Sequence, residues 1–368
     1  MRRTTKVLVN GLFLIIAAVV GAGLSEAGLR LFYPQPLGVW HHDPVGLALH
    51  WPGLVTYLPQ FGQTVSFNSA GMRDREHALK KPAGVFRILV LGDSFMEALQ
   101  VSYEQSFPRL LERALEQKTG QRVEVINASV SGWGTDDELQ YLNAYGMSWS
   151  PDLILVVMTL HNDISDNLRE RFHTIKNGAL VAQPVVPASF LQYKVVQLKS
   201  LLAARSHAFQ LVNRARRSGE IRVAAGQLSS HVVELFRDGG DGSIARGVEL
   251  TTLLLARMQA LASADGRRVA VVLLPLAVQL SDEKFQGLAQ TATGSPRGLD
   301  LERPQRMILG AASRMGIPAI DLLPGFRAWT AGGGDAVFLE REGHWNERGH
   351  QLAVDIVVRE MVARGLVG

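Results

Sequence analysis

Cysteine is absent from the 368 residues of the chain. Its absence excludes disulfide bonds, thiolate catalysis and cysteine-ligated metal sites, and is compatible with an oxidising compartment without requiring one. Histidine and aspartate offer other metal ligands, at positions 41–43, His50 and His161. No HExxH motif or comparable ligand spacing accompanies them. We therefore expect neither a metal nor a cofactor.

Long basic runs are also lacking, and the longest is the short RARR at residues 214–217. Zinc-finger spacing and aromatic-plus-basic RNA motifs do not occur, so no nucleic-acid partner is expected. The formal net charge is only +4, a mild excess that could favour an anionic membrane surface. Hydrophobic residues make up 47% of the chain and charged residues 20%, which is ordinary for a globular protein.

Ionisable residues are missing from residues 7–25, directly after Arg2, Arg3 and Lys6. This run is long enough to span a bilayer, and the preceding positive charges favour a cytoplasmic N-terminus. Ser25-Glu26-Ala27 loosely resembles a signal-peptidase site, but the apolar run is longer than in most signal peptides, so we favour an uncleaved anchor over residues 1–33. In a Gram-negative host this is a single-pass inner-membrane protein whose main domain faces the periplasm.

The rest of the chain divides into three parts by composition. Residues 34–82 are rich in Pro, Gly, His and aromatic residues without sustained periodicity, which predicts an irregular connector with one or two short strands. Residues 83–368 form the main domain. Within it, residues 164 to about 249 are helix-rich and locally basic. This insertion is a cap over a site, a surface that touches lipid headgroups, or an amphipathic helix with a solvated basic face.

Five short, continuous apolar runs rich in β-branched residues predict buried strands. They lie at residues 86–92, 123–129, 153–159, 268–275 and 317–322. Segments between them, such as that from Phe107 to Gly120, have helical spacing and a glycine stop. The alternation predicts a three-layer α/β/α fold of the flavodoxin-like kind, with a parallel sheet and ligands bound beyond the carboxyl ends of its strands.

The first predicted strand ends in Gly92-Asp93-Ser94 and leads directly into helical residues. A serine at the amino terminus of a helix is well placed for nucleophilic attack beyond a strand end. Asp and Ser are also the commonest N-cap residues, so this motif alone is equally compatible with a plain cap.

Residues after the next two strands could supply hydrogen bonds to an oxyanion. Gly132 follows the second strand in SVSGWGT, and Asn162 follows the third in TLHND. Together with the Ser94 N–H, the Gly132 N–H and the Asn162 amide form a possible oxyanion hole. Taken separately, Gly132 could be a turn glycine and Asn162 an Asx-turn residue.

A catalytic serine needs a base, and the base needs a group that holds its tautomer. His344 lies between glycine and an apolar helix near the carboxyl terminus, with Glu342 two residues before it. We expect His344 to be the base and Glu342 its orienting carboxylate, with Asp335 as a competing candidate. His350 is expected to be structural.

The ordered blocks GDSF, SGWG, HND and GHWNERGH resemble those of the SGNH hydrolase superfamily, over residues 67–362. By this resemblance Ser94 is the nucleophile and first oxyanion donor, Gly132 and Asn162 are the other donors, and His344 is the base. FNSAGMRD, at residues 67–74, resembles the membrane-anchored branch related to exopolysaccharide O-acetyltransferase-like proteins. The chain departs from the family at Arg341, where many members have Asp, and at Leu160, where many have Gly.

The resemblance implies an esterase that forms an acyl-enzyme at Ser94, acting on a small-molecule, lipid or glycan acyl ester. Two alternatives remain open. The acyl group could pass to a hydroxyl of an envelope polysaccharide, which would make the protein an O-acyltransferase. The fold could also serve as a catalytically inactive binding or assembly module of the cell envelope.

Overall fold

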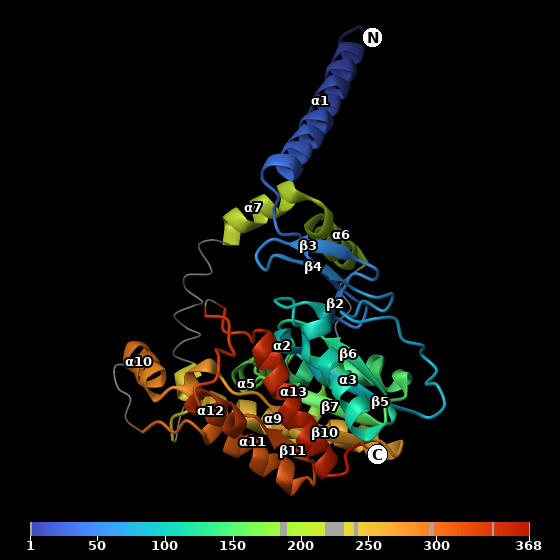
Figure 1. Ribbon diagram of the computed structural model, residues 1–368. Coiled ribbons are helices and arrows are strands. Elements are labelled where there is room, and N and C mark those ends of the chain that lie inside the picture. Colours follow the sequence, from blue (N-terminus) through green and yellow to red (C-terminus); the bar gives the residue numbers. More distant parts are fainter. Residues whose placement is uncertain are drawn as a thin grey trace.

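A five-stranded parallel sheet forms the centre of the molecule (Figure 1). The computed structural model describes residues 2–184, 190–217, 232–238, 242–293, 298–340 and 342–367. The strand order is β11-β10-β7-β5-β6, and each neighbouring pair is parallel. The strands are β5 (Val85–Gly92), β6 (Arg122–Ser129), β7 (Leu153–Met158), β10 (Arg268–Leu273) and β11 (Ala319–Asp321). All five predicted strands are confirmed within a few residues.

Helices cover both faces of this sheet, which explains why its strands are apolar without alternation. One face packs against α3 (Phe107–Thr119), α12 (Leu323–Ala331) and α13 (Glu347–Ala363). The other packs against α4 (Thr135–Ala144), α9 (Gly242–Ala264) and α11 (Arg303–Arg314). Along β5, Ile88 and Val90 face the first layer, whereas Leu89 and Leu91 face the second. Because these side chains are fully buried, each contributes roughly 1.5 to 3 kcal/mol to the free energy of unfolding. The predicted three-layer fold is confirmed.

Shorter elements complete the domain. They are the helices α2 (Ser94–Glu97), α5 (Leu160–Asn167) and α10 (Asp282–Thr293), and the 3-10 turns η1 (Tyr103–Gln105), η2 (Gly146–Trp149) and η3 (Ala277–Leu280). Of these, α2 and α5 begin at the carboxyl ends of β5 and β7 and carry two of the predicted site residues.

Residues 34–82 form four short strands where one or two were expected. They pair as two antiparallel hairpins, β1 (Trp40–His42) with β2 (Ala48–His50) and β3 (Val55–Leu58) with β4 (Gln63–Ser66). Strands of three or four residues are too short for periodicity to reveal. The segment also packs on the main domain, since Trp133 Nε1 donates to the Ala48 carbonyl at 3.0 Å and Tyr145 Oη to Asp43 at 2.8 Å.

The predicted insertion contains strands as well as helices. Helix α5 spans residue 164, where the insertion was expected to begin. A hairpin of β8 (His173–Lys176) and β9 (Ala179–Ala182) follows it. Helices α6 (Phe190–Arg205) and α7 (His207–Arg217) come next. The insertion ends inside α9, which packs against β10. Residues 185–189, 218–231 and 239–241 of the predicted insertion lie outside the described residues.

Helix α1 (Arg2–Phe32) projects away from the rest of the molecule (Figure 1). Over Val9–Phe32 it is apolar enough and long enough to cross a membrane, and none of it is buried against the domain. A signal sequence shares this length and composition.

Candidate active site

Ser94 lies where the sequence predicted it, at the carboxyl end of a central strand. β5 ends at Gly92, and the Asp93 side chain caps the following turn by accepting a hydrogen bond from the Phe95 amide at 3.0 Å. Ser94 is the first residue of α2. The N-cap role therefore belongs to Asp93, which leaves the Ser94 hydroxyl available for other contacts.

The structure brings His344 to this hydroxyl across 250 residues of sequence. The distance between His344 Nε2 and Ser94 Oγ is 2.8 Å, a hydrogen bond whose direction depends on the imidazole tautomer. The imidazole packs on the Phe95 ring, with centroids 4.9 Å apart. Its neighbour Trp345 pairs with Phe338 in an isolated β-bridge that holds this loop. With Nε2 unprotonated, the serine hydroxyl donates to it, as base-assisted attack requires.

The surroundings of His344 favour its neutral form. Burial lowers the pKa of His344 below its usual value of 6.5, and the nearby Glu97 carboxylate opposes this shift. At neutral pH the imidazole is therefore unprotonated and able to accept the serine proton.

This shift predicts the pH dependence of catalysis. Only the neutral imidazole can act as base, so kcat/KM should fall as the pH drops through the pKa of His344. Since that pKa lies below 6.5, the acid limb should be centred below pH 6.5. A pH-rate profile with an uncharged ester measures this, and an acid limb centred above 6.5 would contradict the assignment.

In the part of the chain that the structure describes, no carboxylate contacts the other nitrogen of His344. Among the described residues, Nδ1 is buried and has no hydrogen-bond partner. The Glu342 side chain is exposed, and its backbone amide donates to the Leu339 carbonyl at 3.3 Å. Asp335 is also exposed and lies 3.9 Å from Arg348. Arg341 lies outside the described residues. Ser94 and His344 thus form a dyad, with the imidazole held by packing.

Glu342 is an exposed residue of the cavity lining, and its replacement by alanine should change kcat by no more than about twofold, because no contact with the imidazole is lost. Loss of a true orienting carboxylate costs on the order of 10⁴-fold. Steady-state kinetics distinguish these outcomes, with Asp335→Ala as a matched substitution of a second exposed acid. A drop of a hundredfold or more in Glu342→Ala would restore Glu342 to the orienting role.

The two other predicted oxyanion donors differ in their surroundings. Asn162 lies in the first turn of α5 and lines the same cavity as Ser94. Its Nδ2 donates to Asp93 Oδ2 at 2.8 Å, which leaves its second amide hydrogen for another acceptor. Gly132 lies just after β6 with φ 81°, a conformation that favours glycine, and it lies outside the cavity lining. Thr159 also donates to Asp93, so this buried carboxyl ties the β5 and β7 ends together.

A cavity of about 470 Å³ opens in front of the dyad. Its polar side holds Ser94, His344, His161 and Asn162, its apolar side holds Phe95, Val232, Leu276, Ala277 and Val278, and Glu342 and Gly343 complete the lining. This division suits an ester, because an acyl chain can lie on the apolar side while the carbonyl meets the serine.

His161 is a cavity residue that the sequence pattern did not single out for catalysis. Burial, helped by the nearby His344, lowers the pKa of His161 to about 4, so its imidazole is neutral at pH 7. Its Nδ1 is buried without a hydrogen-bond partner among the described residues. The sequence indicated His161 only as a possible metal ligand. The described residues contain no group of three His, Cys, Asp or Glu that could hold a metal ion.

Arg73, from the FNSAGMRD segment, holds the far end of the nucleophile turn. Its guanidinium is buried and donates to the carbonyls of Glu97 at 2.9 Å, Ala98, and Val101 at 2.6 Å. The Glu97 and Ala98 carbonyls lie at the end of α2, where Ala98 has φ 53°, and Val101 lies three residues further on. The turn that begins with Ser94 is thus clamped by a cation at its carboxyl end, where the partial negative charge of a helix lies.

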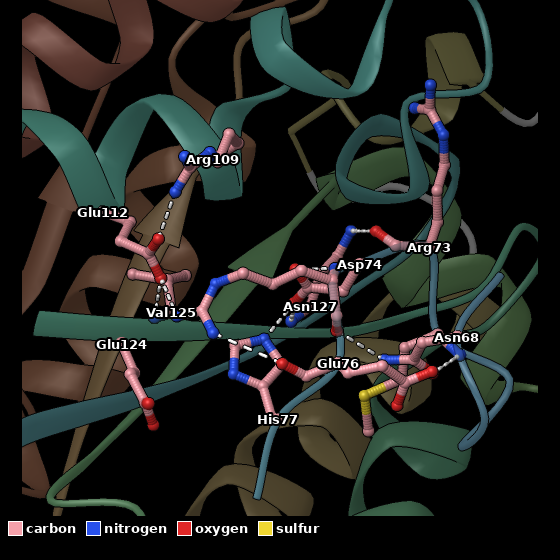
Figure 2. Close-up of polar contacts among 12 residues, drawn as sticks. Asn68, Arg73, Asp74, Glu76, His77, Arg109, Glu112, Glu124, Val125 and Asn127 are labelled. Carbon is pink, nitrogen blue, oxygen red and sulfur yellow. Dashed lines mark hydrogen bonds and ion pairs between the residues drawn. The ribbon is translucent and has the colours of Figure 1, made fainter. Parts of the chain in front are cut away.

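Figure 2 shows how this segment is fixed. The Arg73 side chain points away from its neighbour Asp74, which instead accepts the backbone amide of Asn127 on β6 at 2.8 Å. Asn68 Oδ1 accepts the amides of Ala70 and Met72, which closes the loop that delivers Arg73. The segment therefore joins β6 to α2.

His50 makes a second link between residues 34–82 and the site. Its Nε2 lies 2.6 Å from Glu97 Oε1, and its Nδ1 lies 3.0 Å from the Gly71 carbonyl. The other Glu97 oxygen accepts the Ser131 amide at 2.8 Å and the Ser131 hydroxyl. Buried His50 and Glu97, together with half-buried Ser131, thus hold the loop that contains Gly132.

Comparison with known proteins finds similarity to one curated enzyme. No protein-family model matches the chain. The chain is 35% identical over 100 residues to an arylesterase from Vibrio mimicus, a match that covers 25% of this chain and 50% of the arylesterase. The chain thus spans about half the length of this relative.

The solved structures that match are less similar in sequence. TesA is 16% identical, with a TM-score of 0.39 over 75% of this chain and 97% of its own. The acetylxylan esterase Axe2 from Geobacillus stearothermophilus is 10% identical, with a TM-score of 0.41 over 75% and 94%. A G-D-S-L family protein described as a putative lipolytic protein, from Desulfitobacterium hafniense, is 12% identical, with a TM-score of 0.38 over 74% and 98%.

The four sequence blocks lie at one edge of the central sheet. GDSF, SGWG and HND each follow a neighbouring strand of one parallel sheet, and GHWNERGH returns to the first of them through His344. This arrangement is the one on which the resemblance to the SGNH hydrolases rests.

Proposed function

We propose that this protein hydrolyses acyl esters through an acyl-enzyme at Ser94. The observation that carries the proposal is the 2.8 Å contact between Ser94 Oγ and His344 Nε2 at the edge of a partly apolar cavity. Similarity to an arylesterase supports the same reaction class. In this scheme His344 takes the hydroxyl proton as Ser94 attacks the ester carbonyl, then returns it to the departing alcohol. Water, activated by His344, releases the acid.

The donors assigned to the oxyanion are the Ser94 and Gly132 amides and the Asn162 side chain. Of these, Asn162 and Ser94 line the cavity. His161, neutral at pH 7 and facing the same cavity, is placed to hydrogen-bond the alcohol part of the ester. Arg73 holds the turn that begins with Ser94, and His50 holds the loop that contains Gly132. Neither side chain touches the substrate in this scheme.

We also propose that residues 1–33 anchor the protein in the cytoplasmic membrane, with residues 83–368 as a catalytic domain on the extracytoplasmic side. The apolar helix over Val9–Phe32 supports the anchor, and the preceding basic residues support the orientation. In this arrangement residues 34–82 belong to the catalytic unit as its clamp.

Hydrolysis of p-nitrophenyl esters of increasing acyl length by the full-length chain tests the proposal. An acyl-enzyme pathway should show a burst of p-nitrophenol equal to the enzyme concentration when deacylation is slow. Turnover should reach a maximum at an acyl length that the apolar side of the cavity accommodates. A folded wild-type protein that releases no p-nitrophenol from any of these esters would contradict an esterase.

A further inference from the structure

Helix α6 has one face against the described part of the protein and one apolar face that the described residues leave exposed. On the inner face, Ala204 is buried and the Ala203 carbonyl accepts the Gly38 amide at 2.8 Å, next to β1. On the outer face, large apolar side chains are exposed at intervals of four, three and four residues. They are Leu191, Val195, Leu198 and Leu202, with exposed fractions of 72%, 43%, 55% and 38%. This spacing places them in one stripe along the helix.

Basic side chains border this stripe. At about 100° per residue, Lys194 and Lys199 project roughly 60° to one side and 80° to the other side of the stripe. A long lysine side chain such as Lys199 at the edge of an apolar face suits a helix that lies in a membrane interface, because its ammonium group reaches the headgroups while its stem stays apolar. Helix α7 adds exposed Arg216, one turn after exposed Val212, and exposed Arg214 on the other side of the helix.

The α6–α7 hairpin is fixed to the foot of the proposed anchor (Figure 1). Glu26 of α1 caps α7 by accepting the amides of His207 at 2.9 Å and Ala208 at 3.0 Å, and also the Ser206 hydroxyl at 2.9 Å. Arg30 of α1 donates to the Arg205 carbonyl at 2.6 Å, which ends α6. The junction between the two helices is therefore held at the end of the apolar span.

The exposed apolar surface of the anchor continues at this junction. Leu31, Phe32 and Tyr33 are 75%, 86% and 58% exposed. A bilayer crossed by α1 would end next to the hairpin, since Glu26 and Arg30 are the first charges after the apolar run. The surface nearest to the α6 stripe is thus the surface of that same bilayer.

We propose that the α6–α7 hairpin lies on the bilayer that α1 enters. The stripe of Leu191, Val195, Leu198 and Leu202 enters the boundary between headgroups and acyl chains, and Arg214 and Arg216 contact anionic headgroups. This inference rests on the proposed anchoring, and it does not depend on esterase activity. It assigns the hairpin the task of holding the catalytic domain at a fixed orientation to the membrane.

The absence of cysteine makes the test direct, because one introduced cysteine can carry a fluorophore. Leu198→Cys and Leu202→Cys would be labelled in the full-length chain, placed in nanodiscs and exposed to lipids brominated in their acyl chains. Both probes should be quenched, as should a probe at Leu24→Cys in the anchor. A probe at Gln117→Cys, on an exposed face of α3, should not be quenched.

A charge-reversal experiment tests the contact with the headgroups. In discs with anionic lipid, Arg214→Glu combined with Arg216→Glu should reduce quenching at Leu202 to the level seen in neutral discs. Probes at Leu198 and Leu202 that behave like the Gln117 probe, while Leu24 is quenched, would overturn the proposal. If the fluorophores at Leu198 and Leu202 are buried without any brominated lipid, and only when a disc holds several copies of the protein, the stripe contacts a second protein. That result would also overturn the proposal. Loss of quenching at Leu24 would overturn the anchor itself and leave the esterase proposal untouched.

Discussion

Ser94→Ala is expected to lower kcat for ester hydrolysis by at least about 10⁴-fold, and His344→Ala by a similar factor. The hydroxyl and the imidazole are 2.8 Å apart and act as one unit, so neither is useful alone. The double variant should consequently be no slower than either single variant, because effects within one catalytic unit do not add. Single-turnover and steady-state kinetics with an activated ester measure all three.

Ser313→Ala provides the matched control, since Ser313 is an exposed serine on α11, away from the cavity. It should retain wild-type kcat. If Ser94→Ala kept more than a tenth of wild-type activity while folded, the acyl-enzyme would have to form elsewhere. If the double variant were slower than the singles by the product of their effects, Ser94 and His344 would act in separate steps.

Replacement of Arg73 by methionine is expected to have the second largest effect, on stability as well as catalysis. Three buried carbonyls, of Glu97, Ala98 and Val101, would lose a donor, and Ala98 would keep the Val101 amide at 3.3 Å. Unsatisfied buried acceptors cost about 1 to 3 kcal/mol each, so the free energy of unfolding should fall by about 3 to 5 kcal/mol. Urea denaturation measures this loss.

The catalytic effect of Arg73→Met should appear in kcat more than in KM. Arg73 fixes the carboxyl end of a single turn whose first residue is Ser94, and a displacement of about 1 Å at a nucleophile can cost on the order of a hundredfold in rate. Arg73→Lys keeps the charge and one or two of the hydrogen bonds, so it should restore part of kcat.

Arg75→Met is the control for both readouts. Arg75 lies two residues away in the same loop, but its side chain is 37% exposed and pairs with Glu112 at 3.0 Å. Its loss should cost no more than about 1 kcal/mol. Equal effects of Arg73→Met and Arg75→Met would mean that Arg73 only contributes charge to the loop. A normal kcat in folded Arg73→Met would remove Arg73 from the positioning of Ser94.

The sheet could be predicted from the sequence because each of its strands leaves a local apolar run. The Ser94–His344 pair could be predicted because the four sequence blocks occur in a fixed order. Strands buried on both faces leave continuous apolar runs, as in β5 and β7, and parallel strands bring their carboxyl ends to one edge. Ser94 and Asn162 therefore had to lie at that edge. The position of His344 followed from the order of the four blocks and the family resemblance, since no local pattern joins residues 250 apart.

The clamps could not be predicted in the same way. From the sequence, Arg73 is expected to be a surface charge after a turn. Its partners are backbone carbonyls 24 to 28 residues further on, and backbone carbonyls leave no pattern in a sequence. Glu97 and His50 likewise become a buried pair only through the tertiary fold. The glycine and the polar residues of FNSAGMRD were the available signal, and they indicated only a family resemblance.

Glu342 illustrates the opposite error of sequence reasoning. Two residues before His344 is a plausible spacing for an orienting acid, but spacing within a loop does not fix the direction of its side chains. The turn from Leu339 exposes Glu342 and leaves Nδ1 of His344 buried without a described partner. Similarly, the hairpins in residues 34–82 consist of strands too short to produce a period.

Labelling with a fluorophosphonate, followed by mass spectrometry of the digested protein, tests the central claim most directly. The account predicts one phosphonyl adduct, on the peptide that contains Ser94, formed in the full-length wild type and slowed by about 10³-fold or more in His344→Ala. A folded wild type that stays unlabelled, an adduct on another residue, or labelling of His344→Ala at the wild-type rate would contradict it.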